Sequence, residues 1–257
     1  MKIAISGKGG VGKTTLAGSL AKLFAEEGKK VIAVDADPDS NLASALGVPH
    51  EKMEKLTPLS EIKELIKERT GAIPGVLGQM FSLNPKVDDI PEKYCIEHEG
   101  VKLLQMGGIK KGGSGCVCPE NAFLKAVIQH LLLDRDDVLI LDMEAGIEHL
   151  GRATASFVDA FIAVVEPGAR SIKTFEAIKK LARDIGIEQV FVVANKVRDD
   201  CDREFIEKFI DDDDLLGCIS YNEDIIRADK MGLAPYSISQ KLRDEVSRIK
   251  KCLFEKI

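Results

Sequence analysis

Eight residues near the amino terminus have the types and the spacing of a phosphate-binding loop. Residues 7–14 read Gly-x-x-x-x-Gly-Lys-Thr, between an apolar run at residues 2–6 and a helical pattern at residues 13–27, which is the context that a P-loop requires. Backbone N–H groups of such a loop surround phosphate oxygens, and the lysine neutralises the terminal phosphates. The threonine hydroxyl can ligate Mg²⁺. We therefore predict nucleotide binding, with Mg²⁺ at Thr14, by Gly7, Lys8, Gly9, Gly10, Val11, Gly12, Lys13, Thr14 and Thr15.

Two segments that carry carboxylates follow apolar runs typical of buried strands. Asp142 ends the run at residues 138–142, which is the physical form of a Walker B element whose carboxylate coordinates Mg²⁺ directly or through water. Residues 35–41, Asp-Ala-Asp-Pro-Asp-Ser-Asn, follow a strand predicted at residues 30–35. An ordinary polar turn is the alternative for this segment, but its place after the phosphate loop favours a role at the nucleotide.

Cys116 and Cys118 stand one residue apart in a glycine-rich loop. In an extended backbone both side chains point to the same side, so two thiolates would form half of a tetrahedral site. The chain offers no second pair of suitable spacing, whereas a two-fold symmetric dimer would supply it from the partner. Such a site suits Zn²⁺, Cu⁺ or Ni²⁺. The alternatives are two small loop residues or a redox pair.

The elements needed to position these residues alternate along the chain. Apolar strands are predicted at residues 2–6, 30–35, 101–106, 137–143, 160–165 and 189–194, and helices at residues 13–27, 59–69, 119–132, 150–156, 171–185 and 239–255. This alternation predicts an α/β P-loop NTPase with a mostly parallel central sheet flanked by helices. We expect a single ATPase domain over residues 1–257, in which residues 48–118 form a less regular insertion that carries the cysteine pair.

The composition excludes several classes of protein. Lys and Arg total 36 and Asp and Glu total 42, which gives a net charge of −6, whereas nucleic-acid binding rests on a positive surface. No apolar run approaches the length of a membrane span, and the first residues lack the apolar segment of a signal peptide. Six cysteines are too sparse for a disulfide scaffold. We expect a cytoplasmic protein without nucleic-acid or membrane partners.

Lys8, the second residue of the phosphate loop, cannot easily serve the same phosphates as Lys13 from the same direction. In this respect the sequence resembles the deviant Walker A family of dimeric ATPases, in which an extra lysine reaches across a nucleotide-sandwich dimer. The resemblance implies a homodimer, with Asp37 positioning or activating the attacking water and Asp35 holding Mg²⁺ through water. It also implies that the backbone N–H of Gly146, in the switch II segment, senses the γ-phosphate.

Asn195, Lys196 and the two residues after them resemble the base-recognition loop of this family. A guanine-specific loop would place aspartate where Arg198 stands, so the sequence favours adenine, with Asn195 as its contact. Residues 219–222 resemble the second loop that flanks the base, although Ser220 replaces a proline that is common in the family.

Three segments together resemble the CooC-type accessory ATPases of carbon monoxide dehydrogenase: the cysteine pair, residues 142–151 and residues 165–168. The resemblance implies ATP hydrolysis coupled to nickel insertion into carbon monoxide dehydrogenase, or a related action on acetyl-CoA synthase. Ni²⁺ or Zn²⁺ would be bound by Cys116 and Cys118 between two subunits.

Two alternatives of other classes use the same phosphate loop. The first is a partitioning or division-site scaffold that binds DNA or membrane, and the second is an iron–sulfur electron-transfer ATPase. The negative net charge argues against the scaffold. So does the terminal helix, whose basic face is interrupted by Asp244, Glu245 and Glu255.

Overall fold

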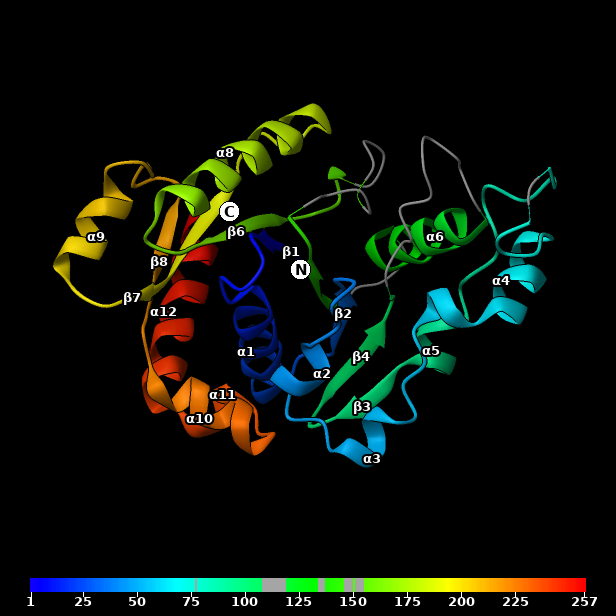
Figure 1. The fold of residues 1–257 in the computed structure, drawn as a ribbon, viewed down its shortest axis with the longest axis horizontal. Coiled ribbons are helices and arrows are strands. Elements are labelled where there is room, and N and C mark those ends of the chain that lie inside the picture. Colours follow the sequence, from blue (N-terminus) through cyan, green and yellow to red (C-terminus); the bar gives the residue numbers. More distant parts are fainter. Residues whose placement is uncertain (77, 108–118, 134–136, 146–149, 151–154) are drawn as a thin grey trace.

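The computed structural model describes residues 1–76, 78–107, 119–133, 137–145, 150 and 155–257 (Figure 1). Its strands are β1 (Lys2–Gly7), β2 (Val31–Ala36), β3 (Ile96–His98), β4 (Val101–Gln105), β5 (Val138–Met143), β6 (Ala160–Val165), β7 (Phe191–Val197) and β8 (Leu215–Ser220). Its longer helices are α1 (Lys13–Glu26), α4 (Lys63–Thr70), α6 (Pro119–Leu133), α8 (Ala169–Asp184), α9 (Asp200–Glu207), α10 (Glu223–Met231) and α12 (Gln240–Lys256). Its short helices are α2 (Leu42–Ala45), α3 (His50–Met53), the 3₁₀ turn η1 (Leu59–Glu61), α5 (Ile90–Tyr94) and α11 (Pro235–Ile238).

The strands form one sheet in the order β3-β4-β2-β5-β1-β6-β7-β8. Strand β3 pairs antiparallel with β4, and the other neighbouring pairs are parallel. Parallel neighbours need a crossover connection, which the helices supply. The prediction of an α/β fold with a mostly parallel sheet is therefore confirmed.

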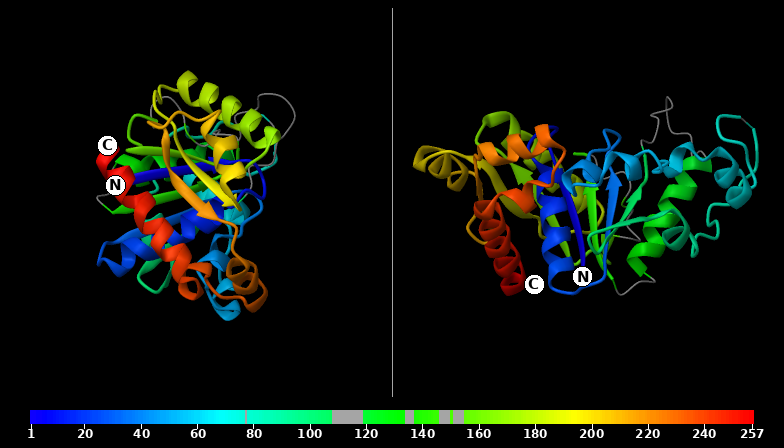
Figure 2. Two further views of the ribbon diagram at one scale, coloured as in Figure 1. Left: turned by 90° about the vertical axis from the view of Figure 1, so that its left-hand side faces the viewer. Right: turned by 90° about the horizontal axis from the view of Figure 1, so that it is seen from below.

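Helices cover both faces of this sheet, so its central strands are buried on both sides (Figures 1 and 2). Successive side chains of a strand point to opposite faces. On β1, Ile3 and Ile5 pack into the layer formed with α1 and α12, whereas Ala4 packs into the layer formed with α6 and α8. This two-sided burial explains why the strands read as continuous apolar runs in the sequence.

The structure differs from the sequence predictions in several elements. The helix predicted over residues 59–69 is divided, since η1 ends at Glu61 and α4 begins at Lys63. The short strands β3 and β8 were not predicted. Strand β4 lies within the predicted insertion and pairs with β2 inside the sheet. The helix predicted at residues 150–156 falls mostly outside the described residues.

The carboxyl ends of β1, β2, β4, β5, β6 and β7 meet at one edge of the sheet because these strands are parallel. This edge gathers the phosphate loop, residues 35–41, Asp142 and the residues that follow β6 and β7. Among the described residues, no helix has both the length and the apolar character needed to cross a membrane.

Candidate nucleotide site

The phosphate loop turns from the end of β1 to the start of α1 through glycines, two of which, Gly7 and Gly12, have no room for a side chain. Gly12 caps α1 in the left-handed conformation, with φ 98° and ψ 25°. A Cβ atom on Gly12 would lie 2.0 Å from Nδ2 of Asn195, and a Cβ atom on Gly7 would lie 2.5 Å from the carbonyl oxygen of Val164. The backbone is therefore packed against β6 and β7, and the amino end of α1 is directed to bind an anion.

Lys13 begins α1 and is almost fully buried, with 6% of its side chain exposed. Its ammonium nitrogen lies 3.4 Å from Oδ2 of Asp37. The structure thus brings together the lysine predicted to bind phosphate and the aspartate predicted to act on the attacking water. In this structure the carboxylate of Asp37 is the counter-ion of Lys13.

Asp35 lies at the end of β2, and its carboxylate fixes the backbone of the segment that follows. Oδ2 accepts a hydrogen bond from the N–H of Leu42 at 3.0 Å, and Oδ1 accepts one from the N–H of Asp37 at 3.4 Å. Burial nevertheless raises the pKa of Asp35 to about 6. The carboxylate therefore shapes the turn that presents Asp37.

Asp142 is fully buried on β5, next to Asp35 in the paired strand β2. No hydrogen bond of ordinary geometry reaches either carboxylate oxygen from the described residues, although the Thr14 hydroxyl lies close enough to act on them. Burial raises the pKa of Asp142 to about 7, and the Thr14 hydroxyl offsets part of that rise. A buried carboxylate without a partner is costly unless a cation approaches it. The donor set of Asp142 and Thr14 therefore fits Mg²⁺, which takes few protein ligands besides nucleotide phosphates and water.

Asn195 and Lys196 support the phosphate loop through its backbone. Asn195 Nδ2 donates to the carbonyl oxygen of Val11 at 2.6 Å, while its Oδ1 accepts from the N–H of Lys196 at 2.8 Å. The Lys196 ammonium donates to the carbonyl oxygen of Gly10 at 2.6 Å. Both polar ends of the predicted adenine contact, Asn195, are thus hydrogen-bonded within the protein.

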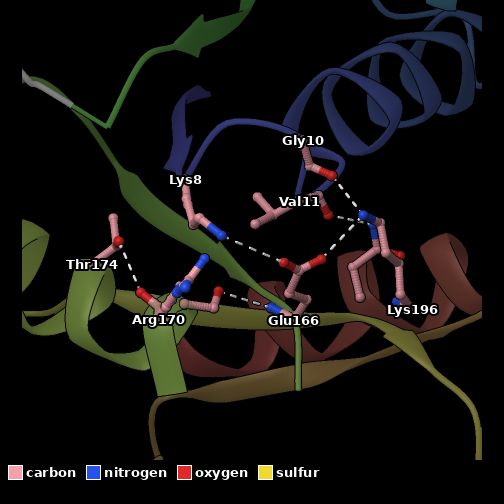
Figure 3. A network of polar contacts seen from close by, with 9 residues as sticks. Lys8, Gly10, Val11, Glu166, Arg170, Thr174 and Lys196 are labelled. Atoms are coloured by element: carbon pink, nitrogen blue, oxygen red, sulfur yellow. Dashed lines mark hydrogen bonds and ion pairs between the residues drawn. The ribbon is translucent and has the colours of Figure 1, made fainter. Parts of the chain in front are cut away.

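Glu166 is a site residue that the sequence analysis did not assign a role. It follows β6, and its carboxylate lies between two lysines of the site (Figure 3). Oε2 accepts a hydrogen bond from Lys196 at 3.0 Å, and Oε1 lies 3.9 Å from the Lys8 ammonium. The signal available in the sequence was an acidic residue directly after an apolar strand, but its partners depend on the order of strands in the sheet.

A cavity of about 300 Å³ adjoins the amino end of α1. Its lining combines hydroxyl groups of the phosphate loop and α2 with apolar side chains from α10 and the residues after it: Thr14, Thr15, Asn41, Ser44, Ala45, Ile225, Ile226, Asp229, Leu233 and Pro235. Ile226 and Leu233 are each 43% exposed. The cavity thus offers an apolar surface directly beside the predicted phosphate site.

Cys116, Cys118 and Gly146 lie outside the described residues. Within the described ranges, no three His, Cys, Asp or Glu side chains are grouped to hold a metal ion. The described residue before the cysteine segment, Gly107, has φ 77°, and a Cβ atom there would lie 2.2 Å from Oγ of Ser60.

Just before that glycine, the N–H of Met106 donates to the carbonyl oxygen of Asp35 at 2.8 Å. The chain that leads to the cysteine pair is thereby tied to the strand end that carries the predicted Mg²⁺-binding acid.

The sheet order, the glycine loop between β1 and α1, and the pairing of Lys13 with Asp37 beside Asp142 define a P-loop NTPase. A family model described as the CobQ/CobB/MinD/ParA nucleotide binding domain matches residues 2–236. The MinD cell division protein of Aquifex aeolicus has a similar fold, with a TM-score of 0.67 and 19% identity, covering 100% of this chain and 98% of that one.

Two relatives match over nearly their whole length. The carbon monoxide dehydrogenase accessory protein CooC of Rhodospirillum rubrum is 48% identical over 257 residues, covering 100% of this chain and 97% of that protein. An uncharacterized ATP-binding protein of Methanocaldococcus jannaschii is 46% identical over 252 residues, covering 97% and 96%. The chain therefore belongs to the CobQ/CobB/MinD/ParA family and, within it, to the CooC-type ATPases.

Proposed function

We propose that this ATPase is a metallocentre maturation factor that supports nickel insertion into carbon monoxide dehydrogenase. The observation that carries the proposal is the 48% identity, over the full chain, to a carbon monoxide dehydrogenase accessory protein. The pair Cys116 and Cys118 adds a chemistry that ATP hydrolysis alone does not need, because two thiolates are suited to bind a borderline or soft metal ion. A client related to acetyl-CoA synthase remains the alternative within the same class.

The residues of the nucleotide site have different roles in ATP hydrolysis. On ATP binding, the terminal phosphates take the place of Asp37 as the counter-ion of Lys13. Thr14 and Asp142 would hold Mg²⁺, which neutralises phosphate charge when bound, with Asp35 beside them. Asp37, released from the lysine, orients the attacking water and accepts its proton.

The nucleoside part of ATP occupies the cavity between α2 and α10. This placement is supported by Thr14 and Thr15, which line the cavity and belong to the phosphate-binding segment. Ile225 and Ile226 offer the apolar surface that a purine ring needs, and Asp229 is a candidate acceptor for its amino group. Asn195 contacts the base only when it exchanges one of its present partners.

ATP closes two subunits into a homodimer in which Lys8 reaches the nucleotide of the partner. The two cysteine pairs, one from each subunit, then form a single four-thiolate site for Ni²⁺ or Zn²⁺. Hydrolysis reverses the closure and separates the pairs, which releases the metal ion to the client. The link between Met106 and Asp35 supports this coupling, because it joins the nucleotide edge to the chain that leads to the cysteines.

The test is a metal titration of the anaerobically reduced protein with and without a non-hydrolysable ATP analogue. Native mass spectrometry reads the mass of the dimer and the bound Ni²⁺ or Zn²⁺ together. The expected result is one metal ion per dimer, present with the analogue and absent from a Cys116→Ala/Cys118→Ala variant. That variant keeps its ATP-driven dimerisation.

Other outcomes separate the competing functions. Dimerisation with ATP but without metal bound by the cysteines would overturn the maturation function and favour a scaffold, which co-sedimentation with DNA or anionic liposomes would then reveal. A brown protein with visible absorption after anaerobic purification would indicate an iron–sulfur electron-transfer ATPase instead.

A further inference from the structure

In this structure Lys8 points back onto its own chain. Its ammonium lies 3.9 Å from Oε1 of Glu166, whose other oxygen accepts the hydrogen bond of Lys196 (Figure 3). We propose that Glu166 is a positioning residue that retains Lys8 within its own subunit and thereby opposes ATP-driven dimerisation. The inference rests on the proposed homodimer, since Lys8 must leave Glu166 to reach the nucleotide of a partner.

The backbone holds Glu166 beside the phosphate loop. Strand β6 pairs with β1 in a register that places Val164 beside Gly7, and the approach is so close that a Cβ atom on this glycine would meet the Val164 carbonyl oxygen at 2.5 Å. Two residues further on, the N–H of Glu166 donates to Oγ of Ser171 in the first turn of α8 at 3.0 Å. The backbone of Glu166 is therefore held beside the loop independently of either lysine.

The two lysines are bound to Glu166 unequally. Lys196 makes a hydrogen bond of 3.0 Å to the carboxylate and a second of 2.6 Å to the carbonyl oxygen of Gly10. Its backbone has φ 62°, which is uncommon for a residue with a side chain and is held by the surrounding contacts. Among the described residues, Lys8 has only the longer ion pair of 3.9 Å to the carboxylate, while exposure does not separate the two side chains, at 38% for Lys8 and 42% for Lys196. Lys8 is thus the partner that can leave.

Departure of Lys8 does not leave Glu166 without a counter-ion, because Lys196 stays in place. This arrangement lowers the cost of release, since an acid next to a phosphate site would otherwise be left unpaired. Retention is correspondingly weak. A partly exposed ion pair of this kind alters an equilibrium by about threefold. A dimer breaks two such pairs and the factors multiply, so the combined effect is about tenfold.

The experiment measures the dimer dissociation constant by analytical ultracentrifugation with saturating non-hydrolysable ATP analogue and Mg²⁺. Glu166→Gln removes the charge and keeps the shape, and it is expected to tighten the dimer about tenfold. Glu166→Asp restores the charge and should return the constant toward that of the unmodified protein. Asp214→Asn removes the acid of a different partly buried ion pair, with Lys179, and should leave the constant unchanged.

A double-mutant comparison assigns the effect to Lys8. In a Lys8→Met background, Glu166→Gln should change the residual monomer–dimer equilibrium by less than twofold. If Glu166→Gln leaves the dimer constant of the otherwise unmodified protein unchanged, or acts equally without Lys8, retention by Glu166 is overturned. If instead Lys8→Met dimerises as well as the unmodified protein, the failure lies in the proposed crossing of Lys8.

Discussion

The ammonium of Lys13 lies 3.4 Å from Oδ2 of Asp37, in a pair whose lysine is 6% exposed and whose aspartate is 14% exposed. A cation at the start of α1 therefore meets a side-chain carboxylate where a phosphate group is expected to lie. The acid and the nucleotide compete for one lysine, so binding and hydrolysis respond differently to removal of this acid.

Asp37→Asn is expected to tighten ATP binding about threefold, because Lys13 loses its competing counter-ion. The same change should slow turnover by about 10²-fold or more, because an amide cannot accept the proton of the attacking water. The sequence contains no tryptophan, so binding is best followed with a fluorescent ATP analogue and turnover by phosphate release. If turnover by the Asp37→Asn variant stays within tenfold of that of the unmodified enzyme, the catalytic role assigned to Asp37 is contradicted.

The buried carboxylate of Asp142 predicts a stability that depends on pH. Its pKa is about 7 in the folded chain against an ordinary value of 3.8, so between these values the folded state binds more protons than the unfolded state. Stability therefore falls as the pH rises through this window. The raised pKa of Asp35, about 6, acts in the same direction.

Asp142→Asn removes the free-energy cost of ionising a carboxyl group in this buried position. We expect it to raise the melting temperature of the nucleotide-free protein at pH 8, by the equivalent of a few kcal/mol of unfolding free energy, and by less than half as much at pH 5. Scanning calorimetry at the two pH values measures the difference. Mg²⁺ with nucleotide should stabilise the unmodified protein at pH 8 more than the variant, and equal stabilisation would contradict the assignment of Mg²⁺ to Asp142.

Two glycines of the phosphate loop form a matched pair for testing its backbone. A Cβ atom on Gly12, whose φ is 98°, would lie 2.0 Å from Nδ2 of Asn195, whereas nothing lies within 4 Å of a Cβ atom on Gly9. Gly12→Ala should therefore lower the melting temperature of the nucleotide-free protein by several degrees, through strain and overpacking. Gly9→Ala should change it by less than about one degree, and similar losses for both would argue against the packing described.

The placement of the nucleoside predicts that Ile226→Asp weakens ATP binding about tenfold, because a carboxylate would replace apolar contact with the base and repel the phosphates. Ile73→Asp is the matched control. Both isoleucines are exposed to nearly the same extent, 43% and 44%, but Ile73 does not line this cavity. Titration of both variants with the fluorescent ATP analogue makes the comparison. Equal affinities of the two variants would contradict the placement of the base in this cavity.

The strands that could be predicted from sequence are those buried on both faces. Strands β1, β2 and β5 are continuous apolar runs because helices cover both sides of them. Strand β3 has three residues, none of them buried, and β8 alternates buried and half-buried residues around Gly217. Short or irregular strands at the edge of a sheet leave little apolar periodicity to detect.

The site was predictable where its residues act through the local chain and less so where they act across the sheet. Lys13 and Thr14 follow from loop spacing, and Asp142 follows from a strand that ends in a carboxylate. The role of Glu166 depends on β6 lying beside β1, which brings it to Lys8 over 158 residues of sequence. Asn195 shows the same limit, since it lies in β7, which β6 separates from β1, and its hydrogen bond to Val11 depends on that strand order.

The two outer strands of the sheet restrict how copies of this chain can associate. At one end β3 is only three residues long and runs antiparallel to its neighbour. At the other end β8 pairs with irregular register and packs against α12. Edges of this kind are poor templates for strand addition. Lateral extension of the sheet from one chain into another is therefore disfavoured, which protects against fibre-like stacking. Association between copies is directed instead toward the loops and helix ends.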